Sequence, residues 1–347
     1  MNTKEEVNEL DIMKVIMTLL VVIGHVCRIY SPYSIIKLEI GNSILSNIAS
    51  FIYSFHMPAF VFISGVIYYY IKRDLKRYNN EFKFIYKKAL RLIVPYIFFS
   101  LFIVIPTLYF LDLIKINLFK YIINNYILCL DNRHLWYLIM LFGVFIIFNH
   151  YEKYLYKHYY ILFPLLFIAS IFHQLITPYF GASNIAYYFI YFYLGYLYGK
   201  NKSKIYPFFT THLLPIIGIS GFLLLFFWFI NTIINDKIYL CIINYITAIL
   251  GTVLIYSISI KLSSNTKIIK NKTIINLNKN SYAIYLFHPM IIYLLFSILA
   301  KQSSIKISSF LIAFMILIAS IIASLILTYF FRKIKLNLVI GENINSK

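Results

Sequence analysis

Three ionisable residues of the first apolar segment have the spacing of one helical face. Lys14 and His25 are eleven residues apart, which is about three turns and roughly 16 Å along a helix axis. Asp11 precedes Lys14 by one turn, where its carboxylate can pair with the lysine ammonium. A lone membrane histidine more often bonds a neighbouring helix, but ionisable groups aligned at membrane depth favour chemistry. We therefore expect a cation at the cytoplasmic end of this helix and an imidazole inside the bilayer.

Two further histidines stand near prolines in apolar segments. His56 precedes Pro58 by two residues, and His288 directly precedes Pro289. A proline removes a helix hydrogen bond and can kink the helix, which in a membrane usually marks a cavity. His56 either lines such a cavity or bonds the carbonyl that the proline frees, and both alternatives stay open. We expect His288 about two turns from the cytoplasmic end of its segment.

Basic and aromatic residues stand where two other apolar segments begin. Arg91 follows Lys88 at the start of the third segment, and it either snorkels to the interface or binds phosphate as a planar fork. Arg133, His134 and Trp136 begin the fourth segment on its outer side. Trp136 is an ordinary aromatic-belt residue there. Arg133 and His134 together suit a polar ligand.

The composition places these residues in a membrane protein. Of the 347 residues, 61% are hydrophobic and 13% are charged, and the mean hydropathy is +0.78. A soluble domain carries about 25% charged residues. Apolar runs close to twenty residues recur along this chain, as a bilayer about 30 Å thick requires. We therefore predict an all-α, polytopic transmembrane helical bundle and exclude the soluble-enzyme, disordered and disulfide-scaffold classes.

Ten segments are long enough to span the bilayer. They cover residues 12–28, 44–71, 92–114, 134–149, 159–176, 185–199, 210–230, 238–260, 282–300 and 307–331. We expect the semi-apolar stretch 116–130 to be interfacial or re-entrant, and Ser64-Gly65 in the second span to be a small-residue packing site. No loop is long enough to fold separately, so we predict one integral-membrane domain over 1–347, with its core at 8–331 and no appended soluble domain.

The charge pattern predicts that both termini are cytoplasmic. The chain has 32 Lys and Arg against 12 Asp and Glu, a net charge of +20, which basic cytoplasmic loops explain without invoking nucleic acid. In this orientation the segments on the outer side contain only eight of the basic residues, namely Arg28, Lys37, Lys115, Lys120, Arg133, Lys237, Lys301 and Lys306. The basic loop 72–91 is either a topology signal with affinity for anionic lipids or a docking surface for an anionic cytosolic substrate.

Motifs of several other enzyme classes do not occur in the sequence. There is no metal-ligand spacing, no GxGxxG after a strand, no Walker loop and no GxSxG elbow. The 3 cysteines are widely spaced in apolar surroundings and fit neither a disulfide framework nor a zinc site. We therefore expect no bound metal or cofactor.

The polar residues above belong to five motifs that follow one another along the chain. The motifs are Asp11-x2-Lys14-x10-His25, Phe55-His56-Met57-Pro58, Lys88-x2-Arg91-x3-Pro95, His134-Leu135-Trp136-Tyr137 and Ser281-Tyr282-x-Ile284-Tyr285-Leu286-x-His288-Pro289. Together they resemble the membrane-bound acyltransferase family 3, the integral-membrane O-acyltransferases of bacterial surface glycans. The resemblance covers residues 8 to 331, and five motifs in order are more specific than any one of them.

This resemblance implies an acyltransferase of the bacterial cytoplasmic (inner) membrane. The implied co-substrate is acyl-CoA, usually acetyl-CoA, from the cytosol, and the implied acceptor is a hydroxyl of a cell-surface glycan or glycolipid. The essential pair of the family, a basic residue and a histidine in span one, corresponds to Lys14 and His25. The family usually has arginine at the position of Lys14, and lysine keeps the charge but loses the bidentate fork.

The resemblance also suggests a role for each candidate residue. Lys14, Lys88 and Arg91 would hold CoA at the cytoplasmic mouth, with Asp11 as the structural partner of Lys14. His25 would take the proton from the acceptor hydroxyl as that hydroxyl attacks the thioester. The remaining residues would bind the acceptor or stabilise the oxyanion: His56, Arg133, His134, Trp136 and His288.

Two other functions stay open at this point. A transporter or exporter of a polysaccharide intermediate would also use proline-kinked helices with buried histidines. A non-catalytic scaffold in a glycan-assembly complex would tolerate Asn or Gln in place of His25. The basic loop beside a row of polar residues as long as a pantetheine arm favours the enzyme.

Overall fold

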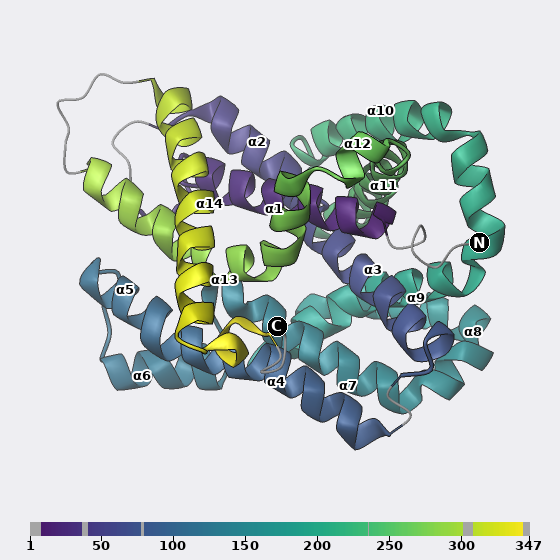
Figure 1. The fold of residues 1–347 in the computed structure, drawn as a ribbon, viewed down its shortest axis with the longest axis horizontal. Coiled ribbons are helices and arrows are strands. Elements are labelled where there is room, and N and C mark those ends of the chain that lie inside the picture. The colour runs from purple at the N-terminus through teal and green to yellow at the C-terminus, as the bar shows by residue number, and fades with distance from the viewer. Residues whose placement is uncertain (1–7, 37–40, 78–79, 235, 301–307, 343–347) are drawn as a thin grey trace. The chain divides into compact units, whose positions relative to one another are not determined.

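The computed structural model describes residues 8–36, 41–77, 80–234, 236–300 and 308–342. Within these ranges all regular secondary structure is helical and no strand occurs (Figure 1). The described residues contain eight helices, or runs of consecutive helices, that are long and apolar enough to cross a membrane. The prediction of an all-α, multi-pass membrane protein is therefore confirmed.

The α-helices follow one another through short connections. They are α1 (Asn8–Arg28), α2 (Ser43–Tyr53), α3 (His56–Tyr69), α4 (Glu81–Phe99), α5 (Ile105–Phe110), α6 (Leu118–Ile122), α7 (Trp136–Lys157), α8 (Tyr159–Ile171), α9 (Ala182–Thr211), α10 (Leu213–Asn231), α11 (Lys237–Ser263), α12 (Thr266–Ile269), α13 (Lys272–Ala300) and α14 (Ser309–Lys333). Wider π-helical turns occur at Tyr70–Asp74, Ser100–Val104 and Ile123–Ile127, and 3-10 turns occur at Arg133–Leu135, His173–Leu175, Tyr179–Gly181 and Asn337–Ile340. The π-helical turn Tyr70–Asp74 continues α3, and the turn Ser100–Val104 continues α4 into α5.

Each of the ten predicted spans coincides with helical structure. Eight of them fall on the membrane-length runs, including Ser43–Asp74, which joins α2 and α3, and Glu81–Phe110, which joins α4 and α5. The other two fall on the shorter apolar helix α8 and on the first half of the long helix α9. Some residues used in the sequence argument lie outside the described residues, namely Lys37, Lys301, Lys306 and Ile307.

Two helices begin earlier than the apolar segments predict. α4 begins at Glu81, so residues 72–91 are not one loop, and its first turn is capped by Asn80, whose side chain accepts a 3.0 Å hydrogen bond from the Lys83 amide. α13 begins at Lys272, so His288 lies about four turns from the helix start rather than two. Hydropathy marks the apolar part of a helix, whereas its polar turns continue beyond that part.

The semi-apolar stretch 116–130 contains only short helical pieces. α6 and the π-helical turn that follows it are five residues long each. A transmembrane helix needs about 20 residues. These pieces are therefore too short to span a bilayer.

The described residues form two compact units whose segments alternate along the chain. Unit 1 contains the described residues of 8–21, 50–77 and 188–281. Unit 2 contains the described residues of 22–49, 80–187 and 282–342. α1 and α13 each contribute residues to both units. Because each unit is assembled from distant parts of the sequence, its sites depend on tertiary structure.

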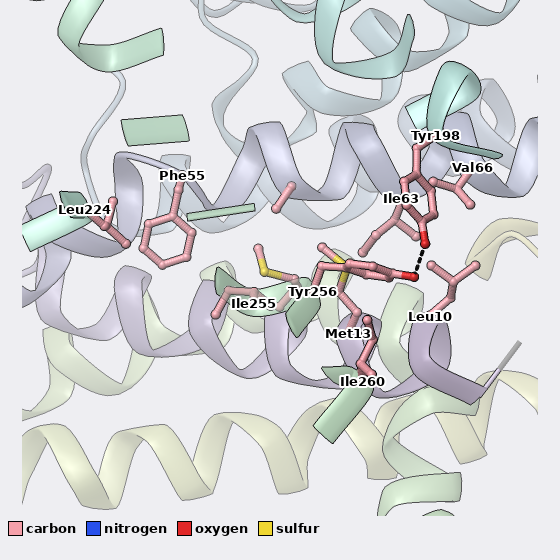
Figure 2. Close-up of a cluster of buried hydrophobic side chains, with 12 residues drawn as sticks. Leu10, Met13, Phe55, Ile63, Val66, Tyr198, Leu224, Ile255, Tyr256 and Ile260 are labelled. Carbon is pink, nitrogen blue, oxygen red and sulfur yellow. Dashed lines mark hydrogen bonds between the residues drawn. The ribbon is translucent and has the colours of Figure 1, made fainter. Parts of the chain in front are cut away.

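Unit 1 has an apolar cluster to which α1, α3, α9 and α11 contribute. Met13 and Met17 of α1 are 0% exposed in it, and Phe55 and Ile63 are 2% and 3% exposed (Figure 2). In a bilayer, helices associate through close packing rather than through removal of apolar surface from water. The fit of these side chains therefore stabilises the unit.

Two glycines bring α3 and α9 of unit 1 into close contact. A Cβ at Gly65 would overlap the carbonyl group of Phe192, and a Cβ at Gly195 would overlap the carbonyl group of Phe62. Each glycine thus faces the backbone of the other helix, as in other membrane helix pairs with small residues at their interface. The prediction of a packing site at Gly65 is confirmed, and Gly195 is its partner.

We expect Gly65→Ala to destabilise the protein by about 1–3 kcal/mol, the usual cost of overpacking. The added Cβ meets backbone atoms, which cannot move aside as the end of a side chain can. Thermal unfolding of the purified protein in detergent measures the effect as a lower Tm. Gly218→Ala in α10 is the matched control, because nothing lies within 4 Å of a Cβ there. Equal Tm values for the two variants would contradict the close helix contact.

Unit 2 contains the packed pair α4 and α7. The rings of Phe84 in α4 and Phe145 in α7 lie 5.9 Å apart in an edge-to-face arrangement, and both side chains are buried. Edge-to-face pairs of this kind stabilise a fold beyond the area they bury. This contact holds α4 against α7, the helix that follows the turn carrying His134.

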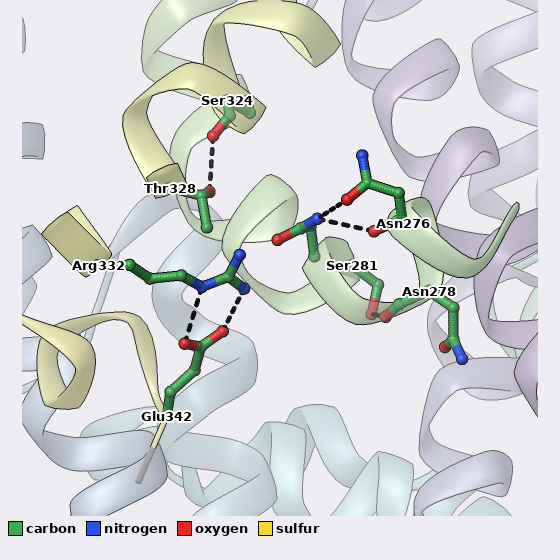
Figure 3. Close-up of polar contacts among 8 residues, drawn as sticks. Asn276, Asn278, Ser281, Ser324, Thr328, Arg332 and Glu342 are labelled. Carbon is green, nitrogen blue, oxygen red and sulfur yellow. Dashed lines mark hydrogen bonds and ion pairs between the residues drawn. The ribbon is translucent and has the colours of Figure 1, made fainter. Parts of the chain in front are cut away.

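The C-terminal segment of unit 2 is fixed to α14 by a charged pair. Arg332 donates two hydrogen bonds to Glu342, from Nε at 3.0 Å and from Nη2 at 2.5 Å (Figure 3). Bidentate pairs of this kind are stronger than neutral hydrogen bonds. Between the two residues Gly341 adopts φ 72°, and a Cβ there would overlap the ring of Tyr282. The segment therefore packs closely against the start of the unit 2 part of α13.

Candidate functional site

Three histidines from three distant segments meet within unit 2. His25 lies on α1, His134 on the 3-10 turn before α7, and His288 on α13. The ring centroids of His25 and His288 are 5.0 Å apart with planes at 71°, and those of His134 and His288 are 6.4 Å apart. We call these three residues the histidine group. The sequence motifs contain all three but do not show that they meet.

Backbone carbonyls fix the orientation of two rings in the histidine group. His288 Nδ1 lies 2.7 Å from the carbonyl oxygen of Ile284, and His134 Nε2 lies 3.2 Å from that of Leu286. A carbonyl oxygen only accepts, so each of these ring nitrogens carries the proton and donates. The opposite nitrogens, His288 Nε2 and His134 Nδ1, are buried and have no hydrogen-bond partner among the described residues. In the neutral rings, His288 Nε2 and His134 Nδ1 each present a lone pair that can accept a hydrogen bond.

Tyr285 supports the histidine group from the same helix as His288. Its hydroxyl donates to the backbone carbonyl of His134. Its ring lies 5.8 Å from that of His134 and 5.7 Å from that of Tyr137. Sequence analysis quoted Tyr285 within a motif but gave it no role. Its spacing of three residues from His288, which places both on one helix face, is the signal that could have found it.

A hydrogen-bonded loop precedes His134 and positions it. The hydroxyl of Tyr96 donates to the carbonyl of Tyr126 at 2.7 Å and accepts from the side chain of Asn132 at 3.3 Å. Asn132 is 2% exposed, so this bond lies in the interior. Sequence analysis missed Tyr96 and Asn132, because they lie far apart in the chain and belong to no periodic pattern.

Cys129 lies in the same loop but does not have the surroundings of a nucleophile. Its Sγ is 3.5 Å from the hydroxyl of Tyr96. Burial raises the pKa of the Cys129 thiol, so the thiol stays protonated at neutral pH. The thiolate, which is the reactive form, is therefore disfavoured.

Arg133 and Trp136 lie next to His134 in unit 2, where the sequence placed them. The Nη1 of Arg133 pairs with Asp131 at 3.0 Å, and its Nε is buried without a hydrogen-bond partner among the described residues. The backbone of Arg133 has φ 53°, a conformation that costs energy in a residue with a side chain. Trp136 is half-buried, with its ring 6.2 Å from that of Tyr137. The guanidinium group of Arg133 is thus held by Asp131 and keeps an N–H that can donate to a ligand.

Lys14 and Asp11 pair in unit 1, as their spacing on α1 predicts. Lys14 Nζ lies 3.8 Å from a carboxylate oxygen of Asp11, and both side chains are about one third exposed, at 32% and 40%. The hydroxyl of Thr18 donates to the Lys14 carbonyl at 2.8 Å. A partly exposed pair of this kind adds little stability.

His56 lies in unit 1 at the break between α2 and α3. Its Nδ1 donates to the carbonyl of Ile52 at 2.9 Å, and its ring lies 4.7 Å from that of Tyr53. The residues between the two helices leave carbonyls of α2 without their usual helical donors. Pro58 lacks the amide hydrogen that would bond the carbonyl of Ser54, four residues earlier. His56 instead bonds Ile52, whose carbonyl also accepts from the Phe55 amide at 3.3 Å, so this bond is not to the carbonyl that Pro58 frees.

Lys88 and Arg91 lie one turn apart on α4 in unit 2. Lys88 Nζ is 3.9 Å from the ring centroid of Phe145 and 5.4 Å from that of Phe84, so aromatic rings hold the ammonium group. Arg91 is exposed, and its guanidinium group lies 5.7 Å from the ring centroid of Tyr282. The hydroxyl of Tyr282 donates to the Arg91 carbonyl at 2.7 Å. Of the two cations, Arg91 is the more accessible to an anionic ligand.

The described residues contain no group of three His, Cys, Asp or Glu side chains placed to hold a metal ion. The unpartnered lone pairs of the histidine group are instead suited to accept hydrogen bonds from hydroxyl groups.

Comparison with known proteins gives one match. The family model described as an acyltransferase domain matches residues 7–329, nearly the whole chain. No curated protein and no solved structure matches the chain.

Proposed function

We propose, from the premise that the chain belongs to the acyltransferase 3 family, that it transfers an acetyl group from cytosolic acetyl-CoA to a hydroxyl of a cell-surface or lipid-linked glycan. Membership of an acyltransferase family favours this activity over export of a polysaccharide intermediate. The observation that supports a hydroxyl acceptor is the histidine group, in which two buried ring nitrogens present unpartnered lone pairs. A sugar carries several hydroxyl donors that can satisfy them.

The proposed reaction is a direct transfer with His25 as the general base. The hydroxyl oxygen forms a bond to the thioester carbonyl carbon, and the carbon–sulfur bond of acetyl-CoA then breaks. The hydroxyl proton passes to His25 and from there to the leaving thiolate of CoA. His134 and His288 are both fixed with an accepting nitrogen free, so in their neutral forms they orient the acceptor hydroxyls rather than donate to the oxyanion.

The donor side of the site uses cations that face the cytoplasm in the predicted orientation. The resemblance assigns Lys14 to the phosphate groups of CoA, and Arg91 is the accessible cation of unit 2 that can form a charge-assisted hydrogen bond to a phosphate. Lys88 would contribute mainly its charge, because its ammonium group lies against aromatic rings. This arrangement fits a protein of the bacterial inner membrane, whose cytoplasmic face has access to acetyl-CoA.

The acceptor side would use Arg133 and Trp136. The unpartnered Nε of Arg133 can donate to a sugar oxygen, and the indole ring of Trp136 can stack on the apolar face of a sugar ring. Both residues flank His134 in the sequence, so an acceptor held by them lies beside the histidine group.

Transfer of radioactive label tests the proposed function. Membranes from cells with and without the protein are incubated with radiolabelled acetyl-CoA and the glycolipid extract of the native host. We expect label in the glycan fraction only when the protein is present, and removal of that label by mild alkali, which cleaves O-acetyl esters. Label that depends on succinyl-CoA or a longer acyl-CoA instead would contradict acetyl as the acyl group. No transfer from any acyl-CoA would contradict the proposed donor class.

We expect Lys14→Ala to raise the KM for acetyl-CoA about 10- to 100-fold, the value of one charge-assisted hydrogen bond. Lys14→Arg should keep a KM near that of the wild type, because it preserves the charge. Initial rates at varied acetyl-CoA concentration measure the change. Lys115→Ala is the matched control, since Lys115 pairs with Asp112 at the same i,i+3 spacing at the predicted outer side. A similar KM for Lys14→Ala and the control would remove Lys14 from the donor site.

A further inference from the structure

Unit 1 contains a cavity that the proposed reaction does not use. Its volume is about 280 Å³, and it lies between α3, α9 and α11. Its wall is largely apolar and aromatic, and most of the side chains that form it are partly exposed. They include Phe62, Leu194, Leu197, Phe209, Ile249 and Val253. The cavity can therefore be entered and has room for an apolar chain.

Four polar side chains of the cavity wall, those of Tyr198, Tyr256, Thr252 and Asn201, form hydrogen bonds within the unit. The hydroxyls of Tyr198 and Tyr256 bond each other (Figure 2). Thr252 donates to the Ala248 carbonyl at 2.7 Å, and Asn201 donates to the Leu197 carbonyl at 2.9 Å. Apolar cavities of about 150 Å³ stay dry and bind small apolar molecules. The chemistry of this wall selects an apolar occupant.

α9 and α11 run in the same direction along the cavity. The rings of Tyr191 and Tyr245 lie 5.6 Å apart, and further along both helices Tyr198 contacts Tyr256. Residue numbers thus rise together along the two helices. The ends that follow Tyr198 and Tyr256 therefore lie at the same end of the cavity.

That end of the cavity carries exposed lysines. Lys204 follows the cavity-lining Leu197 by seven residues, which is two turns, so it lies on nearly the same helix face. Lys261 lies in the last turn of α11, five residues after Tyr256. Both are exposed, whereas Lys202, two residues before Lys204, pairs with Glu9 at 2.8 Å. An apolar cavity thus has cations at one end, the arrangement that fits a lipid with an acidic headgroup.

We propose that this cavity binds an anionic phospholipid of the cytoplasmic leaflet. One acyl chain occupies the space between α3, α9 and α11, and the phosphate group contacts Lys204 and Lys261. The predicted orientation places both lysines on the cytoplasmic side, where anionic lipids attract basic residues. The site is separate from the histidine group, so its test does not depend on the proposed reaction.

Photocrosslinking with a lipid probe tests this proposal. The full-length protein in nanodiscs is irradiated with phosphatidylglycerol that carries a diazirine in one acyl chain, and labelled peptides are mapped by mass spectrometry. We expect label on the cavity residues of α9 and α11. Val253→Trp, and the milder Ile249→Phe, should remove most of it by filling the space. Ile322→Trp on α14 is the matched control at an exposed apolar position and should leave it unchanged.

Charge variants test the headgroup contact. Lys204→Gln and Lys261→Gln should each weaken retention of the probe about fivefold, the effect of one lysine near an anionic lipid surface. A phosphatidylcholine probe with the same acyl chains should label the cavity weakly. Its labelling should be the same in the wild type and in the two lysine variants. Equal labelling by the two probes would overturn the proposal, as would label that persists in both filling variants. The proposal would also be overturned if palmitoyl-CoA displaced the phosphatidylglycerol probe while unlabelled phosphatidylglycerol did not. The cavity would then be a binding site for the acyl donor.

Discussion

His25→Ala is expected to lower kcat for acyl transfer by about 10²–10⁴-fold, the contribution of a general base. His25 lies in the histidine group, 5.0 Å from His288, where a proton taken from the acceptor hydroxyl can be held beside a second imidazole. His25→Gln should be equally inactive, because an amide can hydrogen-bond but cannot take up the proton. Membranes with equal amounts of each protein, incubated with labelled acetyl-CoA and acceptor, measure the rates.

The control for this prediction is another histidine. His212 is exposed between α9 and α10, and His212→Ala should keep the wild-type rate. Activity of His25→Gln within a few-fold of wild type would show that His25 has only a structural role.

His288→Leu is expected to lower kcat/KM for the acceptor by about 10- to 100-fold, with the KM for acetyl-CoA unchanged. The variant removes the buried Nε2, whose lone pair is available to a substrate hydroxyl, and a buried polar partner is costly to leave unpaired. His288→Gln should recover part of the activity, because its amide oxygen can reach the position of Nε2 and accept the same hydrogen bond. Varying each substrate separately distinguishes the two constants.

The contrast between the two histidines tests their different roles. Glutamine should fail at His25, where a proton is transferred, and should partly succeed at His288, where a hydrogen bond is accepted. If His288→Gln is as inactive as His25→Gln, then ionisation of His288 takes part in the reaction. A rise in the KM for acetyl-CoA in His288→Leu would place His288 on the donor side instead.

Local features of the protein were predictable from the sequence because they depend on neighbours within a few turns. The Asp11–Lys14 pair follows from helical spacing alone. The all-α, multi-pass architecture follows from apolar runs of bilayer length, since only closed hydrogen-bonding structures such as helices are stable there. Helix ends were less predictable. α4 and α13 continue into polar turns that contain Lys83 and Lys272, and hydropathy does not distinguish such turns from loops.

The candidate site was predictable only as a set of separate residues. The motifs contained His25, His134 and His288, but residues so far apart in the chain meet only through helix packing. Apolar helix faces look alike in sequence, so the pattern does not say which helices pack together. The Gly65 and Gly195 contact, and the bonds of Tyr96 to Asn132 and Tyr126, depend on the same long-range packing.

The sequence by itself thus determined that this is a helical membrane protein with a charged pair and an imidazole on its first helix. Those properties depend on composition and on the helical repeat, which act over a few residues. Tertiary structure alone decided that three histidines form one group and that His134 bonds the carbonyl of Leu286, which is far from it in the chain. The physical reason is that a ring nitrogen becomes a donor or an acceptor through the partner that the folded chain places beside it.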